Sequence, residues 1–306
     1  MSLTPTRLRR AASGKQQGRS SKVAYLFLLP WFIGILGITS IPMLASLYLS
    51  FTSFRLGGTP TWVGLANYQR MFADPSFQGA ALVTAKYVFI SVPLQLAFAL
   101  AIALVLNKGV RGLPVYRSVY YLPSLLGGSV AIAVLWRRLF ANDGLVPEIA
   151  GHLGIQMGSW ISDPDRALTT LMILNVWTFG SPMVIFLAGL RQIPSELLEA
   201  AAVDGAGRLR RFASITVPLL SPVIFFNLVL QLIGAFQAFT PAYIVSSGSG
   251  GPAGSTLFYT LYLFQVGFQS FEMGYASALA WVLFVVIGFF TAVNFVAAKY
   301  WVHYES

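Results

Sequence analysis

The sequence predicts an all-α integral membrane protein with six transmembrane helices. Hydrophobic residue types make up 56% of its 306 residues and charged types only 10%, whereas about a quarter of the residues in a soluble domain are charged. The mean hydropathy is +0.71. Uncharged apolar runs long enough to cross a bilayer recur through most of the chain, which leaves no room for a large soluble core. One integral membrane domain is therefore expected.

Each predicted span is an uncharged run bounded by charged or loop-forming residues. The first run is too long for the apolar core of a signal peptide. A segment rich in Gly, Ser and Pro follows Val245 and ends the fifth span. The six runs are residues 23–49, 87–107, 118–136, 167–190, 212–245 and 273–298. We therefore expect a basic tail at residues 1–22 and a membrane domain at residues 23–306, with its core at about 84–298.

Basic residues are distributed as the positive-inside rule requires. Lysine and arginine number 20 against 10 acidic residues. With the basic tail placed inside and the sides alternating after each crossing, 14 of the 20 fall inside. This pattern explains the positive net charge without a nucleic-acid partner, and it predicts that both termini are cytoplasmic. The tail contributes Arg7, Arg9, Arg10, Lys15, Arg19 and Lys22.

The two long outside connections, residues 50–86 and 137–166, contain aromatic residues, prolines and glycines. Trp62, Tyr68 and Trp160 suit the headgroup layer of a membrane, and the glycines and prolines suit ordered turns. Two interpretations stay open at this point. The connections either pack at the membrane interface or form a docking surface for an external partner.

The sequence lacks the residue types and motifs that several kinds of site require. The chain has no cysteine, and its two histidines, His152 and His303, are far apart in the sequence, so no metal site is expected. No GxxxxGK[ST] sequence occurs, so the chain has no P-loop for ATP. Without HExxH, GxSxG or a cysteine, a membrane-embedded enzyme is disfavoured. The middles of the spans also lack ionisable residues, which disfavours a secondary transporter or a channel.

The connection between the fourth and fifth spans is more patterned than a simple connector. It reads RQIPSELLEAAAVDGAGRLRRFASITVPLLSP. Pro194 predicts the start of a helix and Gly205 its end. A second short helix from Arg208 is expected to lead to Pro218, ahead of the fifth span. The alanine run of the first helix would let another backbone approach closely, as for a helix seated in a partner's groove. The alternative is an interfacial helix with solvated charges.

This connection resembles the EAA signature of permease subunits of ATP-binding-cassette (ABC) importers. The family pattern is EAA, three residues, G, nine residues and I-x-L-P. Two other stretches, WVGLANYQRMFADPSF and SGSGGP, are similar to segments of the carbohydrate-type permeases, maltose and glycerol-3-phosphate permeases among them. Val83 departs from those proteins, in which Asn is expected. The matching residues are Glu199, Ala200, Ala201, Gly205, Ile215 and Pro218, with Val217 in place of the leucine.

The resemblance implies the type I ABC importer permease fold, with a cytoplasmic coupling helix in residues 191–218. A separate ATPase dimer would hold that helix and bind ATP and Mg, so this chain would need no cofactor of its own. The implied partners are that ATPase, a second permease subunit, an extracytoplasmic solute-binding protein and the lipid of a bacterial or archaeal plasma membrane. The predicted coupling residues are Glu199 as charged anchor, Ala200, Ala201 and Gly205 for close approach and the turn, and Asp204 and Arg208 for further polar contacts.

Polar residues in the middles of spans nominate the solute pathway, because polar groups are costly in hydrocarbon. Amides and hydroxyls beside aromatic rings suit a sugar, although each could instead form an interhelical hydrogen bond. The resemblance supports Tyr120, Ser124, Asn175 and Gln237. The predicted substrate-binding residues are Tyr120, Ser124, Asn175, Thr178, Gln231, Gln237 and Tyr243.

The uncharged spans favour a neutral sugar or oligosaccharide as the solute. Glycerol 3-phosphate, or another small polar or anionic solute carried by the same mechanism, is the alternative. A secondary transporter is the rival from a different class.

Overall fold

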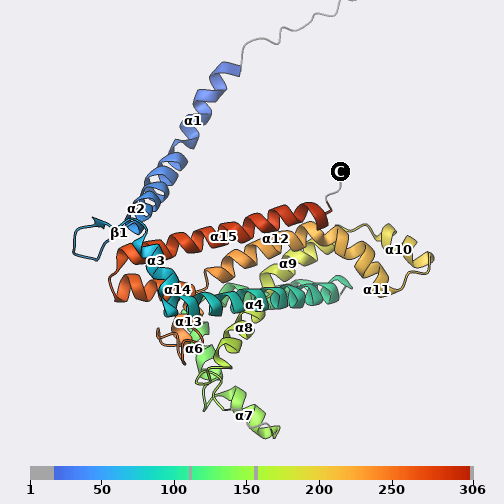
Figure 1. The fold of residues 1–306 in the computed structure, drawn as a ribbon. Helices are drawn as coiled ribbons and strands as arrows, with labels where there is room; N and C mark the ends of the chain where they lie inside the picture. Colours follow the sequence, from blue (N-terminus) through green and yellow to red (C-terminus); the bar gives the residue numbers. More distant parts are fainter. Residues whose placement is uncertain (1–16, 110–111, 155–157, 304–306) are drawn as a thin grey trace, which may run out of the picture. The chain divides into compact units, whose positions relative to one another are not determined.

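The computed structural model describes residues 17–109, 112–154 and 158–303, with backbone only for residues 17–24. Nearly all regular structure in that part is helical (Figure 1). One short antiparallel pair of strands, β1 (Thr52–Ser53) and β2 (Thr61–Trp62), interrupts the helices. The chain divides into two compact units, residues 1–48 and 49–306.

The described part of the first unit, residues 17–48, is a single helical segment. α1 (Gln17–Ile33) continues through a π-helical stretch, η1 (Gly34–Ser40), into α2 (Ile41–Ser50), which ends in the second unit. Residues Tyr25–Ser50 are long and apolar enough to span a membrane. This segment corresponds to the first predicted span.

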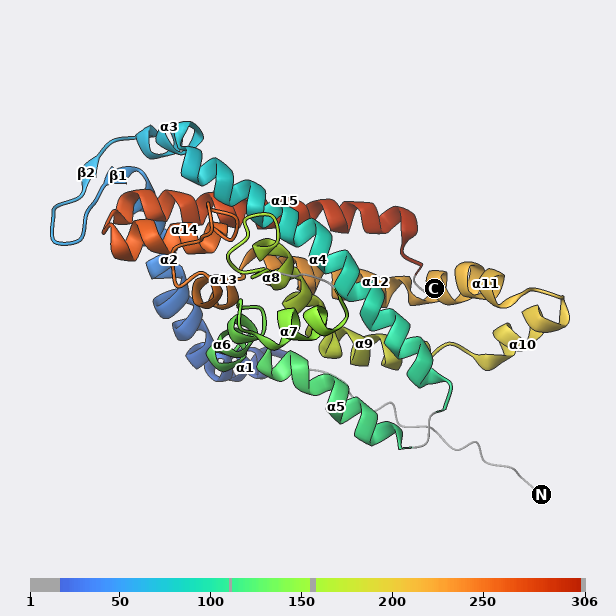
Figure 2. The same ribbon diagram turned by 90° about the horizontal axis from the view of Figure 1, so that it is seen from below.

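The second unit is a helical bundle built around α4 (Pro75–Asn107), which packs against α8 (Ala167–Trp177), α9 (Gly180–Leu190) and α12 (Val217–Phe236) (Figures 1 and 2). α15 (Met273–Trp301) lies along α12. The other helical elements are α3 (Ala66–Ala73), α5 (Leu113–Leu126), α6 (Val130–Leu139), α7 (Leu145–His152), α10 (Ser195–Val203), α11 (Arg208–Arg211), η2 (Phe212–Thr216), α13 (Thr240–Val245), α14 (Tyr259–Phe264) and η3 (Gln265–Gln269).

The six predicted spans are present, four as continuous helical segments and two as bent pairs. The continuous segments are Tyr25–Ser50, Pro75–Asn107, Arg208–Val245 and Met273–Trp301. α5 and α6 meet at 95°, and α8 and α9 meet at 40°. The all-α membrane fold is thus confirmed, but the third and fourth spans are not the straight helices that their uncharged runs suggested.

The bend between α8 and α9 has a local cause in the sequence. Pro182 has no backbone N–H, so it cannot donate to the carbonyl oxygen of Thr178 four residues earlier. The helix ends at Trp177 and restarts at Gly180. Close packing of α5 is possible there because residue 180 is glycine, whose missing side chain leaves space for the backbone of Tyr120.

α4 begins at Pro75 rather than at residue 87, where the uncharged run begins. Asp74 accepts a hydrogen bond from the backbone N–H of Ser76 at 2.9 Å, and Pro75 occupies the first helical turn, so both residues favour a helix start. Lys86 therefore lies inside a helix and not in the external loop to which we assigned it.

Small residues allow the core helices to approach closely. Ala99 and Ala103 of α4 are fully buried. A Cβ at Gly189 of α9 would lie 2.8 Å from Cγ2 of Val223 on α12. Helices in a membrane associate mainly through such packing, because lipid provides no hydrophobic driving force between them. The core of the second unit therefore lies where α4, α8, α9 and α12 meet.

Gly180→Ala is expected to destabilise the bundle. A Cβ at this position would overlap the carbonyl oxygen of Tyr120 and lie 2.7 Å from the Cα of Tyr121. Both are backbone atoms, so α5 would have to move, and such overpacking costs about 1–3 kcal/mol. The measurement is the Tm of the purified full-length protein in detergent.

Gly234→Ala is the matched control, because nothing lies within 4 Å of a Cβ at that position. Alanine favours a helix over glycine, so the Tm of this variant should be unchanged or higher. Equal losses of Tm in the two variants would contradict the close contact between α5 and α9.

Candidate functional site

The predicted coupling residues lie on a hairpin formed by α10 and α11, which extends beyond the neighbouring bundle helices (Figures 1 and 2). α10 runs from Ser195 to Val203, as the positions of Pro194 and Gly205 predicted. Gly205 has a φ of +81°, which favours glycine, and its N–H donates to the carbonyl of Ala202 at 3.1 Å. The turn predicted from the sequence is therefore confirmed.

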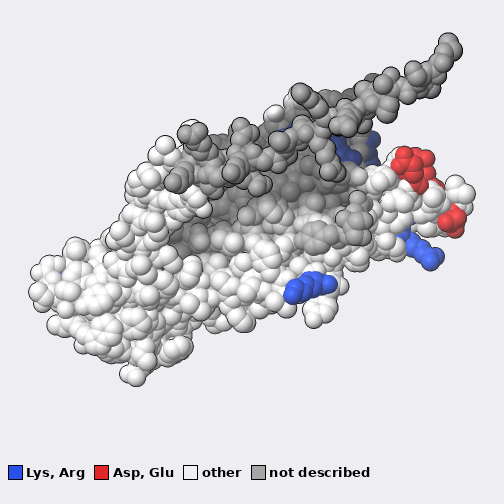
Figure 3. All heavy atoms as spheres, turned by 90° about the horizontal axis from the view of Figure 1, so that it is seen from above, with Lys and Arg blue, Asp and Glu red and all other residues white. Residues whose placement is uncertain are grey.

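No residue of α10 or α11 is buried. Val203 and Leu209 are large apolar residues, yet they are 88% and 80% exposed. Ala201 and Asp204 line a small cavity of about 240 Å³ at the base of the hairpin. In the view of Figure 3 the acidic side chains gather toward one end of a face that is otherwise mostly uncharged. Exposed apolar residues together with charges are typical of a surface that a partner covers.

The second helix of the hairpin is not separate from the fifth span. α11 has only four residues, and it continues without a break through η2 into α12. Pro218 lies in the first turn of α12, where proline is tolerated. Nη1 of Arg211 also donates to the carbonyl of Leu198 at 3.2 Å, which ties α11 to α10. A movement of the hairpin would therefore be transmitted directly to α12.

Three of the predicted substrate residues line one cavity of about 270 Å³. Asn175 and Thr178 come from the end of α8, and Gln237 follows the end of α12. The cavity also touches the breaks between α5 and α6 and between α12 and α13. The full set of lining residues is Tyr87, Gly127, Gly128, Leu174, Asn175, Thr178, Gly234, Ala235, Gln237, Ala238, Phe239, Thr240 and Pro241.

A hydrogen-bond network holds the break beside this cavity. The carbonyl of Thr178, which Pro182 leaves without a helical donor, accepts from Nε2 of Gln95 at 3.2 Å and from Oγ of Ser124 at 2.8 Å. Nδ2 of Asn175 donates to Oε1 of Gln95 at 3.3 Å and to Oγ of Ser91 at 3.1 Å. The amide of Asn175 is thus both a cavity wall and a member of an interhelical network.

The other predicted substrate residues do not reach the cavity. Ser124 donates to Thr178 and accepts from the N–H of Ser181 at 2.7 Å, so its hydroxyl holds the bend between α8 and α9. Tyr120 and Tyr243 have ring contacts with Phe179 and Phe239, respectively. Neither tyrosine, nor Ser124 or Gln231, is among the residues that line the 270 Å³ cavity.

Sequence reasoning missed Gln95, Ser91 and Tyr87. Gln95 is only 1% exposed and is the central member of the network. The signal was available, because Gln95 is an amide in the middle of an apolar run, the same criterion that nominated Asn175. Asn227, on α12, is fully buried, and neither atom of its amide has a partner among the described residues.

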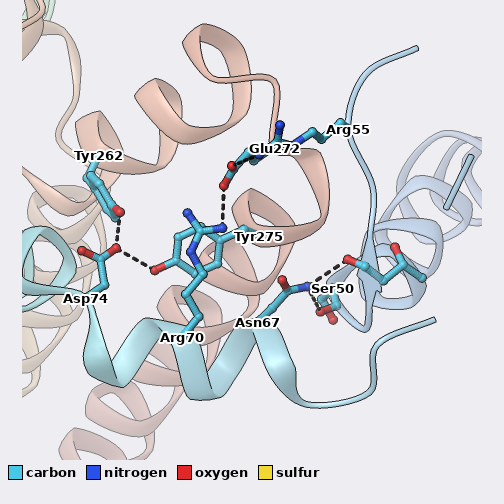
Figure 4. Close-up of polar contacts among 9 residues, drawn as sticks. Ser50, Arg55, Asn67, Arg70, Asp74, Tyr262, Glu272 and Tyr275 are labelled. Atoms are coloured by element: carbon cyan, nitrogen blue, oxygen red, sulfur yellow. Dashed lines mark hydrogen bonds and ion pairs between the residues drawn. The ribbon is translucent and has the colours of Figure 1, made fainter. Parts of the chain in front are cut away.

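A third polar group, the loop-anchoring cluster, joins the segment after α2 to the start of α15 (Figure 4). Arg55 and Arg70 each form an ion pair of 2.6 Å with Glu272. The guanidinium of Arg70 also lies 4.2 Å from the ring centroid of Tyr275. The hydroxyls of Tyr262 and Tyr275 both donate to Asp74. These six residues form the cluster, and they hold α3 and the start of α4 against α14 and α15.

Backbone contacts reinforce this attachment. The N–H of Gly274 donates to the carbonyl of Phe54 at 2.9 Å, and the N–H of Leu56 donates to the carbonyl of Phe271 at 3.1 Å. Nδ2 of Asn67 donates to the carbonyls of Ser50 and Thr52 at 2.8 and 2.9 Å (Figure 4). The segment is thus a fixed part of the second unit.

Electrostatics in the cluster favour an ionised Asp74. Burial raises the pKa of this carboxyl, but hydrogen bonds from Tyr262, Tyr275 and backbone N–H groups act in the opposite direction and hold it below its ordinary value of 3.8. Burial first, and then the neighbouring carboxylate, raise the pKa of Tyr262 to about 12. Tyr262 therefore stays protonated and remains a donor to Asp74 at neutral pH.

Residues 87–299 match the model of a family described as binding-protein-dependent transport system inner membrane component. The matched region contains both the 270 Å³ cavity and the α10–α11 hairpin. It covers most of the chain.

Relatives of full length are also found. The chain is 53% identical over 290 residues to the probable ABC transporter permease protein YesP of Bacillus subtilis (strain 168), with 94% of each chain covered. It is 32% identical over 284 residues to the trehalose/maltose transport system permease protein MalF of Thermococcus litoralis, covering 92% of this chain and 95% of that protein. The arabinooligosaccharides transport system permease protein AraP of Bacillus subtilis is 33% identical over 274 residues, covering 88% of this chain and 86% of that protein.

A solved structure shares the fold. The bacterial alginate ABC transporter in complex with an alginate pentasaccharide-bound periplasmic protein contains a chain that matches with a TM-score of 0.79. The alignment covers 92% of this chain and 95% of that one at 20% identity, so it bears on the fold alone. The family match and the full-length relatives confirm the predicted resemblance to carbohydrate-type ABC importer permeases.

Asp74→Asn is expected to lower the stability of the protein at neutral pH. The amide can still cap α4, but it loses the charge that strengthens the bonds from Tyr262 and Tyr275. Because the pKa of Asp74 is lower in the folded protein than in the unfolded chain, its ionised form stabilises the fold at pH values above the unfolded pKa. This stabilisation is lost as the pH falls through the folded pKa. The difference in Tm between wild type and variant should therefore shrink below a pH of about 4.

The measurement is the Tm of both proteins in detergent from pH 7 to pH 3. A Tm difference that stays constant over this range would contradict an ionised Asp74 as the source of the stabilisation.

Proposed function

This chain belongs to the binding-protein-dependent transport system inner membrane component family, and we propose that it forms half of the pathway by which an ABC importer moves a neutral sugar or oligosaccharide across the membrane. A second permease subunit would supply the other half. An ATPase dimer that binds ATP and Mg would supply the energy, and a solute-binding protein outside the membrane would deliver the sugar. The plasma membrane of a bacterium or archaeon is the proposed location, with both termini in the cytoplasm.

The connection between the hairpin and the cavity supports this proposal. α9 runs from the break at Thr178 to the start of the hairpin, and α12 returns from the hairpin to Gln237. Both helices that enter the hairpin therefore have their other ends at the same cavity. A partner that moves the hairpin would change the cavity walls, which is the requirement for coupling ATP hydrolysis to access.

The surface of the hairpin supports an ATPase partner. Glu199 and Asp204 are exposed acids beside the small residues Ala200 and Gly205, so a basic or polar cleft could hold the helix closely. Ala201 and Arg208 complete the predicted contact residues, and both belong to the same hairpin. The exposed Val203 and Leu209 would be covered in such an assembly.

The lining of the cavity supports a neutral saccharide. Its polar groups include the amides of Asn175 and Gln237, and its aromatic rings are those of Tyr87 and Phe239. No Lys, Arg, Asp or Glu lines this cavity in the described part of the chain. Amides bind sugar hydroxyls and rings pack on sugar faces, whereas an anionic solute would find no counter-charge here. The names of the relatives MalF and AraP refer to transport of trehalose or maltose and of arabinooligosaccharides.

Glu199→Lys should abolish uptake while the protein stays inserted in the membrane, because the substitution reverses the charge at the proposed anchor. Solute uptake by cells carrying the complete transporter is the measurement, together with co-purification of the ATPase. Uptake at the wild-type rate by the Glu199 variant would refute the role of Glu199.

Asn175→Ala and Gln237→Ala should weaken transport while the ATPase still co-purifies. Loss of one hydrogen bond of about 0.5–1.5 kcal/mol corresponds to a half-saturating solute concentration roughly 2- to 10-fold higher. Gln231→Ala is the matched control. Gln231 lies on α12, the helix that ends next to Gln237, but it does not line the cavity. Unchanged kinetics in both test variants would exclude the cavity as the solute site.

A further inference from the structure

A groove of about 640 Å³ lies between α4 and α8, and the proposed solute pathway does not use it. Its walls are mostly apolar. α4 contributes Ile90 and Leu94, and α8 contributes Met172 and Val176. The groove thus follows two neighbouring helices of the core, and its residues differ from those of the 270 Å³ cavity.

Two charged residues without ion-pair partners among the described residues line the groove. Lys86 and Asp165 both line it and are exposed, and neither takes part in an ion pair within the described residues. The nearby Arg166 is already paired with Asp163 at 3.2 Å. The groove is therefore lined by one cation and one anion that have no ion-pair partner among the described residues.

The depth of these groups in the membrane follows from the sequence. The uncharged run 87–107 begins directly after Lys86, and the run 167–190 begins two residues after Asp165. Both charges are therefore expected at the boundary between headgroups and hydrocarbon. Leu94 lies eight residues beyond Lys86, about 12 Å along the helix. The apolar walls consequently extend from the headgroup layer into the hydrocarbon.

We propose that this groove binds a phospholipid whose headgroup combines a phosphate with a primary ammonium group, as in phosphatidylethanolamine. Lys86 pairs with the phosphate, and Asp165 accepts hydrogen bonds from the ammonium group. One acyl chain lies along Ile90 and Leu94. Lipid binding in this groove requires that the chain spans a membrane, and it is independent of the solute that the transporter carries.

The pair of charges selects this headgroup over other common ones. Phosphatidylglycerol carries a phosphate but no cation, so its hydroxyls can donate to Asp165 but leave the charge of the carboxylate without a counter-ion. Phosphatidylcholine carries a quaternary ammonium, which has no N–H to donate to a carboxylate. A zwitterion with a primary ammonium matches both side chains.

The test uses the full-length chain reconstituted with equal amounts of phosphatidylethanolamine, phosphatidylglycerol and phosphatidylcholine. Native mass spectrometry then identifies the lipids retained after transfer to detergent. Phosphatidylethanolamine should be enriched on the wild type. Lys86→Ala should reduce its retention about fivefold, the contribution of one lysine near a lipid surface. Asp165→Asn should remove the preference over phosphatidylglycerol, and Ile90→Trp should fill the groove and reduce retention of all three lipids.

Lys108→Ala is the matched control, because Lys108 lies at the opposite end of the same helix. Its lipid retention should equal that of the wild type. Equal retention in the Lys86, Asp165 and Lys108 variants would overturn the proposal.

A second measurement distinguishes lipid from protein in the groove. The chain has no cysteine, so Ile173→Cys introduces a unique attachment point for a photoreactive maleimide at a lining residue. In the assembled transporter, irradiation should attach the probe to phospholipid. Attachment mainly to another protein chain would show that a neighbouring helix occupies the groove, and would also overturn the proposal.

Discussion

A membrane interior provides no water for unpaired backbone groups, so each break in a helix there must be satisfied by other parts of the protein. The break between α8 and α9 meets this requirement through Gln95 of α4 and Ser124 of α5, which both donate to the carbonyl of Thr178. Three spans are thereby fixed around one backbone oxygen. The cavity that contains Asn175 and Gln237 lies directly beside this point, so its shape depends on the same interaction.

The polar residues in the spans show how far sequence reasoning could reach. Asn175, Thr178 and Gln237, which were selected for their position within the spans, line one cavity. The same criterion could not separate a solute contact from a structural bond, because both place a polar group in hydrocarbon. Ser124 illustrates the second case, since its hydroxyl is engaged on both sides by backbone groups of residues 178 and 181. The structural role of Ser124 is visible only in the folded protein, where the bend between α8 and α9 brings α5 against α9.

Local patterns were predicted more completely than long-range ones. The α10 helix and its turn depend on Pro194, the alanine run and Gly205, all within one short segment, and the structure agrees with each. Hydropathy instead marks where the bilayer begins, not where a helix begins. α4 starts 12 residues before its uncharged run because Asp74 and Pro75 form a helix start outside the hydrocarbon. The position of Lys86 on that helix followed from the structure alone.

The uninterrupted helical path from Arg208 to Phe236 determines how far its cavity end would move when its hairpin end tilts. A helix of this length extends about 40 Å, so a tilt of only 5° about one end would displace the other by roughly 4 Å. That displacement is close to the width of a hydroxyl-bearing carbon. A small angular change of this helix would thus be large enough to admit or exclude a single sugar ring edge.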